Sequence, residues 1–273
     1  KEIVIRALEA GKNVVCEKPV ALSVADFDDM VAAAKKAGKL FPVHQNRRFD
    51  VDFLAIRSLI QSGEIGEPIN IESRIHGSRG IPSDWRCHKP QGGGMILDWG
   101  VHLIDQMLQL IPETVTNVYC ETTNITTDEV DDGFHLLLTF ESGKRAIVEV
   151  GTYNFLALPR FYMQARKGTA LIEDWQKKCR VAKLKAWNEK EVTPVQTAAG
   201  ITKTMAPRDE LTLDYYEIDR PVSDVHDFYR NLVRAIDGTE EQLVKLPEVR
   251  RVLRVMETAF LSAEKKEAVR VSI

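Results

Sequence analysis

The beginning of the chain alternates between helix and strand patterns, and this alternation restricts the possible fold more than any other feature. Residues 2–10 show the spacing of a short helix, and residues 13–16 form a short apolar run typical of a buried strand. A second helix pattern follows Ser23, which with Asp26 makes a near capping box, and residues 40–44 form a second apolar strand pattern. Two strands joined through a helix run parallel, and strands this short need neighbours in a sheet. The chain therefore opens as part of an α/β domain.

The remainder of the chain predicts a different architecture. Its strand patterns are closely spaced and separated by turn residues, which favours antiparallel pairing. Strands are predicted at 69–76, 115–122, 133–140, 145–152, 161–165, 170–174 and 268–273, and helices at 53–60, from Leu97 onward, at 224–236 and from Pro247 to about Glu264. Residues 185–222 indicate a long surface excursion. We expect an α+β domain with one large, open, mainly antiparallel sheet that helices cover on one face. If the other face is apolar, it would pair with another subunit.

The segment that carries most of the chemistry is a triple glycine followed by a largely apolar helix. One stripe of this helix is nevertheless polar, and it consists of Asp98, His102, Asp105 and Gln109. Asp98 and His102 lie one turn apart, so the carboxylate can orient the imidazole and favour its charged form. The two residues then form a general acid–base pair, or equally a buried ion pair that caps the helix. A metal site of Asp98, His102 and Asp105 fits the spacing less well.

The first strand pattern ends in charged residues. Glu17-Lys18-Pro19 follows it directly, and Gln45 follows the second strand pattern. Because ligands bind at the carboxyl edge of a parallel sheet, the two strand ends are expected to frame one crevice. Lys18 can donate to a hydroxyl there, whereas a solvated Glu–Lys pair is the alternative. Pro19 favours a cis peptide bond.

Further along, basic and aromatic residues offer contacts to a ligand. Arg47 and Arg48 can bind polyol or phosphate groups, or can pair with surface acids. Trp85 and Arg86 precede the triple glycine on a loop, where Trp85 is either a stacking lid or an ordinary buried tryptophan.

Composition excludes several classes of function. The 273 residues carry a formal net charge of −3, which does not favour nucleic acid or an anionic membrane as a partner. No apolar run approaches the ~20 residues that cross a bilayer. The four cysteines lie far apart without metal or redox spacing, and no signal peptide pattern opens the sequence. These features predict a cytoplasmic setting.

Three motifs together resemble one protein family. Glu17-Lys18-Pro19, then Asn46-Arg47-Arg48-Phe49, then the triple glycine with Asp98-x-Gly100-x-His102-x-x-Asp105 occur in the order typical of the glucose-fructose oxidoreductase / inositol dehydrogenase (Gfo/Idh/MocA) family. The resemblance covers nearly the whole chain. It implies that residues 1–45 are the C-terminal part of a Rossmann-like dinucleotide-binding domain, a remnant of its parallel sheet. Residues 46–273 would then form the substrate-binding and oligomerisation domain, with the last helix packing back on the first domain.

The resemblance also implies a function and a set of site residues. A member of this family transfers hydride between NAD or NADP and a sugar, cyclitol or related polyol. His102 would exchange the hydroxyl proton, Asp98 would orient and charge His102, and Lys18 would polarise the substrate oxygen. Glu17, Lys18 and Gln45 would line the cofactor. The substrate would contact Arg47, Trp85, Arg86, Asp98 and His102, and no metal is expected.

The sequence departs from the family pattern in one respect. It contains no Gly-x-Gly-x-x-Gly phosphate loop after a first strand, so we expect it to lack the family's N-terminal nucleotide-binding portion. Two alternatives therefore stay open beside the dehydrogenase: a non-catalytic, sugar-sensing or regulatory member, and an inactive truncated fragment. The expected partners are a small polyol or sugar and further copies of the chain, as a homodimer or homotetramer through the open sheet, and neither nucleic acid nor a membrane.

Overall fold

The first 45 residues fold as two short strand segments with a helix beside each. In this computed structural model, residues 1–186, 192–208 and 210–273 are described. The two helices are α1 (Glu2–Glu9) and α2 (Val24–Ala37). The strand segments run parallel, because the Cys16 amide donates to the Pro42 carbonyl and the His44 amide donates to the Cys16 carbonyl. The predicted parallel arrangement is therefore confirmed, and the Lys18–Pro19 peptide bond is cis.

The second part of the chain is built on a nine-stranded sheet. Its strand order is β10-β7-β6-β5-β1-β4-β3-β2-β11, and only the pairing of β1 with β4 is parallel among the described residues. The strands are β1 (Pro68–His76), β2 (Val115–Thr123), β3 (Gly133–Phe140), β4 (Arg145–Gly151), β5 (Phe161–Ala165), β6 (Gly168–Ile172), β7 (Cys179–Leu184), β10 (Leu213–Ile218) and β11 (Val269–Arg270). The large, mainly antiparallel sheet that we predicted is confirmed.

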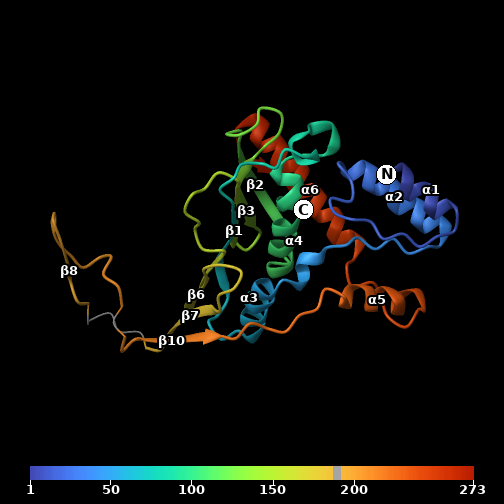
Figure 1. Cartoon of the computed structure of the whole chain (residues 1–273). Coiled ribbons are helices and arrows are strands. Elements are labelled where there is room, and N and C mark those ends of the chain that lie inside the picture. The colour runs from blue at the N-terminus through green and yellow to red at the C-terminus, as the bar shows by residue number, and fades with distance from the viewer. Residues whose placement is uncertain (187–191, 209) are drawn as a thin grey trace.

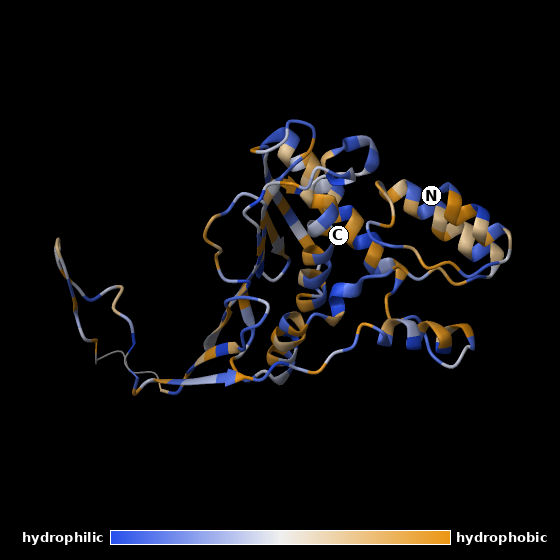
Figure 2. Ribbon diagram, viewed as in Figure 1, coloured by the Kyte–Doolittle hydropathy of each residue, from blue (hydrophilic) through white to orange (hydrophobic). Residues whose placement is uncertain are grey.

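Helices cover one face of this sheet. Figure 1 shows α3, α4 and α6 on the same side of it, and their apolar residues lie against the strands (Figure 2). The helices of this part are α3 (Val51–Ser62), α4 (Val101–Leu110), α5 (Asp227–Ile236) and α6 (Leu246–Lys265). Shorter turns are η1 (Asn46–Phe49), η2 (Trp85–Cys87), η3 (Lys89–Gln91) and the π-helical η4 (Ile96–Gly100).

The excursion predicted at 185–222 holds more strand than the sequence indicated. β10 pairs with β7 at the sheet edge, and a two-stranded hairpin of β8 (Val195–Thr197) and β9 (Gly200–Thr202) projects from the body (Figure 1). Residues 187–191 and 209, which belong to the same predicted excursion, lie outside the described residues. The sequence of β7 has no strict polar–apolar alternation. Its hydrogen-bonded pairing with β6 and β10, rather than its own pattern, makes it a strand.

The uncovered face of the sheet carries a charged network at its centre. Strand alternation places Glu72 and Arg74 of β1 on this face. Arg74 Nε donates to Glu149 Oε2 at 2.9 Å, and Glu149 Oε1 lies 3.0 Å from His76 Nε2. Burial alone would raise the pKa of Glu149. The hydrogen bond with His76 is the strongest of several interactions that lower it, and together they hold the pKa at about 2. This face is therefore mixed rather than uniformly apolar.

α6 belongs to two hydrophobic cores at once. Val249 and Leu253, near its beginning, pack with α1, α2 and the strand segments of the first 45 residues. Val255 and Met256 pack into the larger core between the sheet and its helices. The side chain of Glu257 also accepts a hydrogen bond from the Val24 amide at 2.8 Å. The last long helix thus joins the two parts of the molecule.

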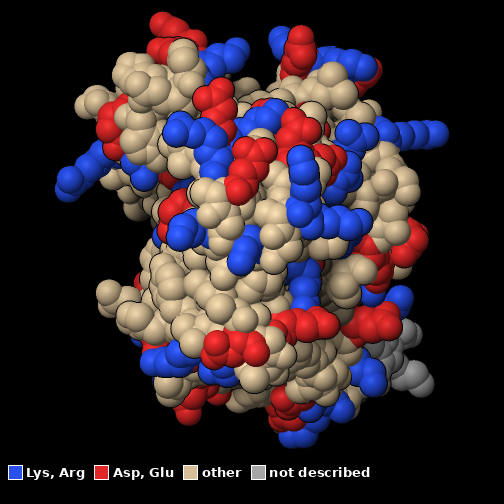
Figure 3. All heavy atoms as spheres, turned by 90° about the vertical axis from the view of Figure 1, so that its right-hand side faces the viewer, with Lys and Arg blue, Asp and Glu red and all other residues tan. Residues whose placement is uncertain are grey.

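Two surface properties bear on possible partners. Over the described residues, no helix is both long and apolar enough to cross a membrane. On the face that carries α1, α2 and α5, basic and acidic side chains are interspersed and do not form separate positive and negative patches (Figure 3).

Candidate active site

The triple glycine allows a loop backbone to approach the start of the site helix closely. A Cβ atom on Gly93 would lie 2.3 Å from the Arg86 carbonyl oxygen. Gly94 has φ +105°, and a Cβ there would lie 2.2 Å from Asp131 Oδ1. The Asp131 carboxylate accepts a hydrogen bond from the Ile96 amide at 2.7 Å and thereby caps the helix start. Burial raises the pKa of this carboxyl to about 7.

Asp98 lies in the π-helical turn that precedes α4, and two cations hold its carboxylate. Lys18 Nζ lies 2.8 Å from Asp98 Oδ1 and 2.9 Å from the Asp98 carbonyl oxygen. Arg86 Nε donates to the other carboxylate oxygen at 2.8 Å. Burial by itself would raise the pKa of Asp98, but the hydrogen bonds from Lys18 and Arg86 outweigh it and lower the pKa. Asp98 is therefore an ionised carboxylate that fixes the position of the lysine.

His102 is buried one helical turn further along, and its environment differs from the predicted one. Asp98 gives its two oxygens to Lys18 and Arg86, and no hydrogen bond joins it to His102 in the part of the chain that is described. Burial lowers the pKa of His102 well below 6.5, and the charges of Lys18, Arg47 and His44 lower it further. The expectation that Asp98 charges the imidazole is wrong, because the carboxylate is already paired and the imidazole is surrounded by cations.

The ends of the two strand segments meet near this helix, as the parallel arrangement requires. His44 Nδ1 lies 2.7 Å from Glu17 Oε1. Gln45 is 1% exposed. Among the described residues, His44 Nε2, Gln45 Oε1, Asn46 Oδ1 and His102 Nδ1 are buried without a hydrogen-bond partner. The Arg47 Nε atom, a donor, is also buried without a partner. Unpartnered buried polar atoms are costly, so their concentration here indicates a place where a ligand supplies hydrogen-bond partners.

Arg47 points toward two aromatic rings that sequence reasoning did not select. Its guanidinium carbon lies 4.2 Å from the centre of the Trp99 ring and 5.3 Å from that of Trp175, and Nη1 lies 3.1 Å from Asp50 Oδ2. Trp99 stands between Asp98 and Gly100 in the motif itself, so its position in the sequence was a usable signal. Trp175 lies on the turn after β6, and nothing in its local sequence connects it to the site.

The remaining predicted residues have mixed positions. Trp85 is 36% exposed, and the Arg86 guanidinium covers its ring at 4.5 Å, so Arg86 links this loop to Asp98. Asp105 does not face the crevice residues but accepts two hydrogen bonds from Arg48, at 2.6 and 2.7 Å. Within residues 1–186, 192–208 and 210–273, no group of three or more His, Cys, Asp or Glu side chains is placed to hold a metal ion.

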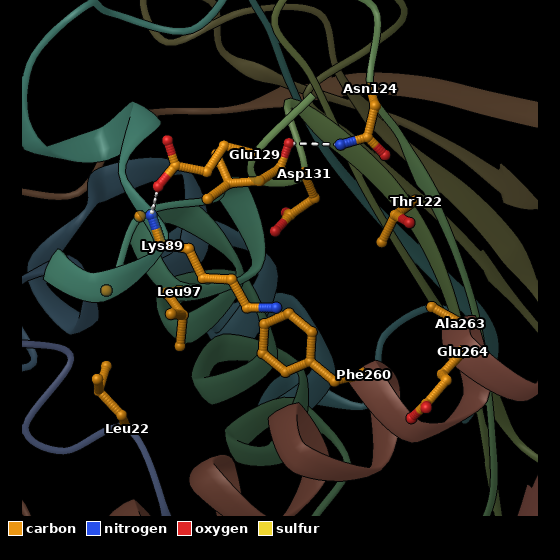
Figure 4. Close-up of a pocket in the computed structure, with 13 residues that line it drawn as sticks. Leu22, Lys89, Leu97, Thr122, Asn124, Glu129, Asp131, Phe260, Ala263 and Glu264 are labelled. Atoms are coloured by element: carbon orange, nitrogen blue, oxygen red, sulfur yellow. Dashed lines mark hydrogen bonds between the residues drawn. The ribbon is translucent and has the colours of Figure 1, made fainter. Parts of the chain in front are cut away.

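One pocket of the described chain lies beside this site rather than within it. It has a volume of about 710 Å³ and is lined by the glycine segment, Leu97, Asp131 and the end of α6. In Figure 4, Lys89 crosses this pocket toward Phe260, and the Lys89 amide donates to Glu129 at 2.8 Å. Lys18, Asp98 and His102 are not among its described lining residues. The pair of Lys18 and Asp98 and the buried His102 therefore lie outside this pocket.

Comparisons with known proteins identify the family. The GFO/IDH/MocA C-terminal domain matches residues 53–171, and the oxidoreductase family with an NAD-binding Rossmann fold matches residues 1–45. A crystal structure of an NAD-binding protein from Listeria innocua is 44% identical with a TM-score of 0.95, and the match covers 99% of this chain and 78% of that one. The chain belongs to the GFO/IDH/MocA family. The prediction from the three motifs is confirmed.

Curated relatives of this GFO/IDH/MocA chain are oxidoreductases. One is the scyllo-inositol 2-dehydrogenase (NADP(+)) IolW of Bacillus subtilis, 28% identical over 276 residues, covering 98% of this chain and 75% of that protein. Another is the uncharacterized oxidoreductase C26H5.09c of Schizosaccharomyces pombe, 37% identical over 142 residues, or 51% of this chain. The chain spans 38% of that protein's length, and 39% and 47% of two further oxidoreductases.

Proposed function

We propose that this chain carries the catalytic groups of a dehydrogenase that acts on a sugar, cyclitol or related polyol with NAD or NADP. One observation carries the proposal: at His102 and the end of the second strand segment, four buried polar atoms have no hydrogen-bond partner in the described structure. Such atoms suit a ligand rich in hydroxyl or amide groups, and both a polyol and the nicotinamide end of the cofactor are ligands of this kind. The likeness to the scyllo-inositol 2-dehydrogenase (NADP(+)) IolW of Bacillus subtilis supports the same substrate class.

The residues at the strand ends fit the nicotinamide end of the cofactor. His44 Nε2 and Gln45 Oε1 are buried acceptors at the carboxyl edge of the parallel segments, and neither finds a donor within the described chain. Glu17, Lys18 and Gln45 would hold this end, while the phosphates find no glycine loop in this sequence. When bound, the cofactor supplies the acceptor for the hydride that leaves the carbinol carbon.

The proton is handled by groups of the chain. His102 is neutral at pH 7 because burial and the cations around it lower its pKa, so the imidazole can accept the proton of the substrate hydroxyl. Lys18, fixed by Asp98, donates a hydrogen bond to the oxygen and stabilises the negative charge that develops there. In the reverse direction the imidazolium returns the proton to the oxygen.

Site-directed variants test this proposal. Joined to a phosphate-binding glycine loop of the kind that the family carries, the protein is expected to reduce NAD⁺ or NADP⁺ in the presence of a panel of cyclitols and aldoses. His102→Ala should lower kcat at least ~100-fold, and Lys18→Met should lower it comparably, because each removes a group that acts on the reacting oxygen. His226→Ala is the matched control, since His226 is an exposed histidine beside α5. Unchanged turnover in His102→Ala would refute the mechanism.

We also propose self-association through the uncovered face of the sheet. Besides the charged network, this face presents half-buried apolar residues such as Leu137 of β3 and Ile147 of β4. An open sheet with such residues is well suited to pack on a second copy. Light scattering after size exclusion should show a dimer or tetramer, and Ile147→Lys should shift it toward the monomer. Weak dimers form at concentrations of about 50 μM, so a wild-type protein that is still a monomer at that concentration would contradict the proposal.

A further inference from the structure

Two indole rings and two guanidinium groups form a stack beside His102. The Trp99 ring meets the His102 ring edge-on at 6.1 Å and lies 6.1 Å from the Trp175 ring. The Arg47 guanidinium contacts both indoles, and the Arg160 guanidinium lies 4.9 Å from the Trp175 ring. We call Arg47, Trp99, Arg160 and Trp175 the aromatic box.

Buried hydrogen bonds and an ion pair hold Arg160 of the aromatic box in place. Arg160 is 3% exposed, donates to Gln106 Oε1 at 3.2 Å, and pairs with Asp52 at 2.9 Å. Gln106 in turn donates to the Arg47 carbonyl oxygen at 2.8 Å. These bonds fix the guanidinium that supports Trp175, so the indole is oriented although it is 39% exposed. An exposed, oriented tryptophan is available to a ligand without further ordering.

Open space borders both indoles. A pocket of about 400 Å³ lies along Trp99 and is also lined by Met95 and the loop 76–80. A second one of about 580 Å³ lies around Trp175 and its turn, residues 174–177. A ligand can therefore approach both rings from outside the protein.

The cations of the box are already neutralised. Arg47 pairs with Asp50 at 3.1 Å and Arg160 pairs with Asp52 at 2.9 Å. Beside the box, Asp98 is shared by Lys18 and Arg86, and Arg86 also pairs with Asp84. A carboxylate or phosphate on the ligand would be repelled by the carboxylates that already pair with these cations. A neutral ligand meets no such repulsion.

We propose that Trp99 and Trp175 form a stacking subsite for the part of a neutral, hydroxylated ring that lies farthest from the reacting carbon, and that Trp175 sets the affinity for that ring. The proposal rests on the proposed function for the position of the reacting carbon at His102. A pyranose or cyclitol ring offers C–H faces that pack on an indole, whereas an open-chain polyol presents no such face. Trp175 is thus a specificity-determining residue that takes no part in proton transfer.

The test measures equilibrium binding and steady-state kinetics side by side. Calorimetric titration with myo-inositol and D-glucose, as neutral rings, is compared with D-sorbitol as an open chain and glucose 6-phosphate as a charged ring. Trp175→Ala should raise Kd and KM for the neutral rings about tenfold, a change of the size expected for one lost aromatic contact, while kcat stays within about twofold. Trp175→Phe should recover most of the affinity. Sorbitol binding should not change in either variant.

Controls separate this proposal from a folding defect and from the proposed function. Tyr215→Ala removes an aromatic residue that is 64% exposed on β10 and should leave every Kd unchanged. Because titration requires no turnover, a protein that binds neutral rings through Trp175 but shows no dehydrogenase activity would refute the proposed function alone. The stacking proposal is overturned if Trp175→Ala leaves the Kd for neutral rings within twofold, if sorbitol loses as much affinity as the rings, or if glucose 6-phosphate binds most tightly.

Discussion

Removing one partner of the Arg48–Asp105 pair should destabilise the protein more than any surface substitution. Arg48 joins three elements, because it donates two hydrogen bonds to Asp105 of α4 and one, at 2.6 Å, to Glu248 of α6. Asp105 is 2% exposed and Arg48 is 9% exposed. A buried charge that loses its partner costs about 3–5 kcal/mol, which is a large share of the ~5–15 kcal/mol that stabilises a typical domain.

The geometry predicts an order among the variants. In Arg48→Met, the buried Asp105 carboxylate loses both of its hydrogen bonds, so the free energy of unfolding should fall by about 3–5 kcal/mol. In Asp105→Asn, Arg48 keeps Glu248 as a counter-ion, so the loss should be smaller. The double variant Arg48→Met/Asp105→Leu removes both charges and should be more stable than Arg48→Met.

Urea denaturation followed by circular dichroism measures these differences, and Arg180→Met serves as the control. Arg180 pairs with Glu173 at 2.9 Å on the surface, where such a pair contributes less than about 1 kcal/mol. The reasoning is refuted if Arg48→Met lowers the free energy of unfolding by less than about 1 kcal/mol. It is also refuted if the double variant is less stable than Arg48→Met.

Three further predictions concern the site helix and the thiols. Because burial and nearby cations lower the pKa of His102 below 6.5, the unfolded chain binds a proton that the folded protein does not, so stability should fall as the pH drops below about 6.5. His102→Gln should flatten that part of the profile of Tm against pH. Gly93→Ala should cost about 1–3 kcal/mol in urea denaturation because its Cβ meets the Arg86 backbone at 2.3 Å, whereas Gly77→Ala, whose nearest contact is 3.9 Å, should be near neutral. Burial raises the pKa of Cys120 to about 12 and that of Cys179 to about 11, so a disulfide reagent at pH 8 should label neither thiol until the protein unfolds.

Much of the fold was predictable because its elements have strong local signals. α2 begins at Ser23, whose side chain accepts from the Asp26 amide at 3.1 Å, and ends at Gly38 in the left-handed region, both as the sequence indicates. β1 places Ile69, Ile71 and Ile75 at alternate positions, and was predicted within one residue of its start. β10, at the sheet edge, and its neighbour β7 were missed because pairing with adjacent strands rather than a local pattern defines them.

The candidate site was predictable in its members but not in its pairings. The motifs located Lys18, Asp98 and His102, and the structure brings Lys18 and Asp98 into contact. Helical spacing indicated a contact between Asp98 and His102, but spacing cannot rank that contact against a lysine eighty positions away. Arg86 competes for the same carboxylate from a loop, and only the folded chain reveals it.

The position of α6 in both cores has a consequence for how the crevice operates. One helix of 20 residues buries Val249 and Leu253 in the first core, and Val255 and Met256 in the second. A rotation of one part of the molecule against the other would therefore have to bend α6 or expose apolar residues that it buries. We expect the two parts to move little relative to each other, and ligands to enter and leave through movements of individual loops, such as the one that carries Trp85.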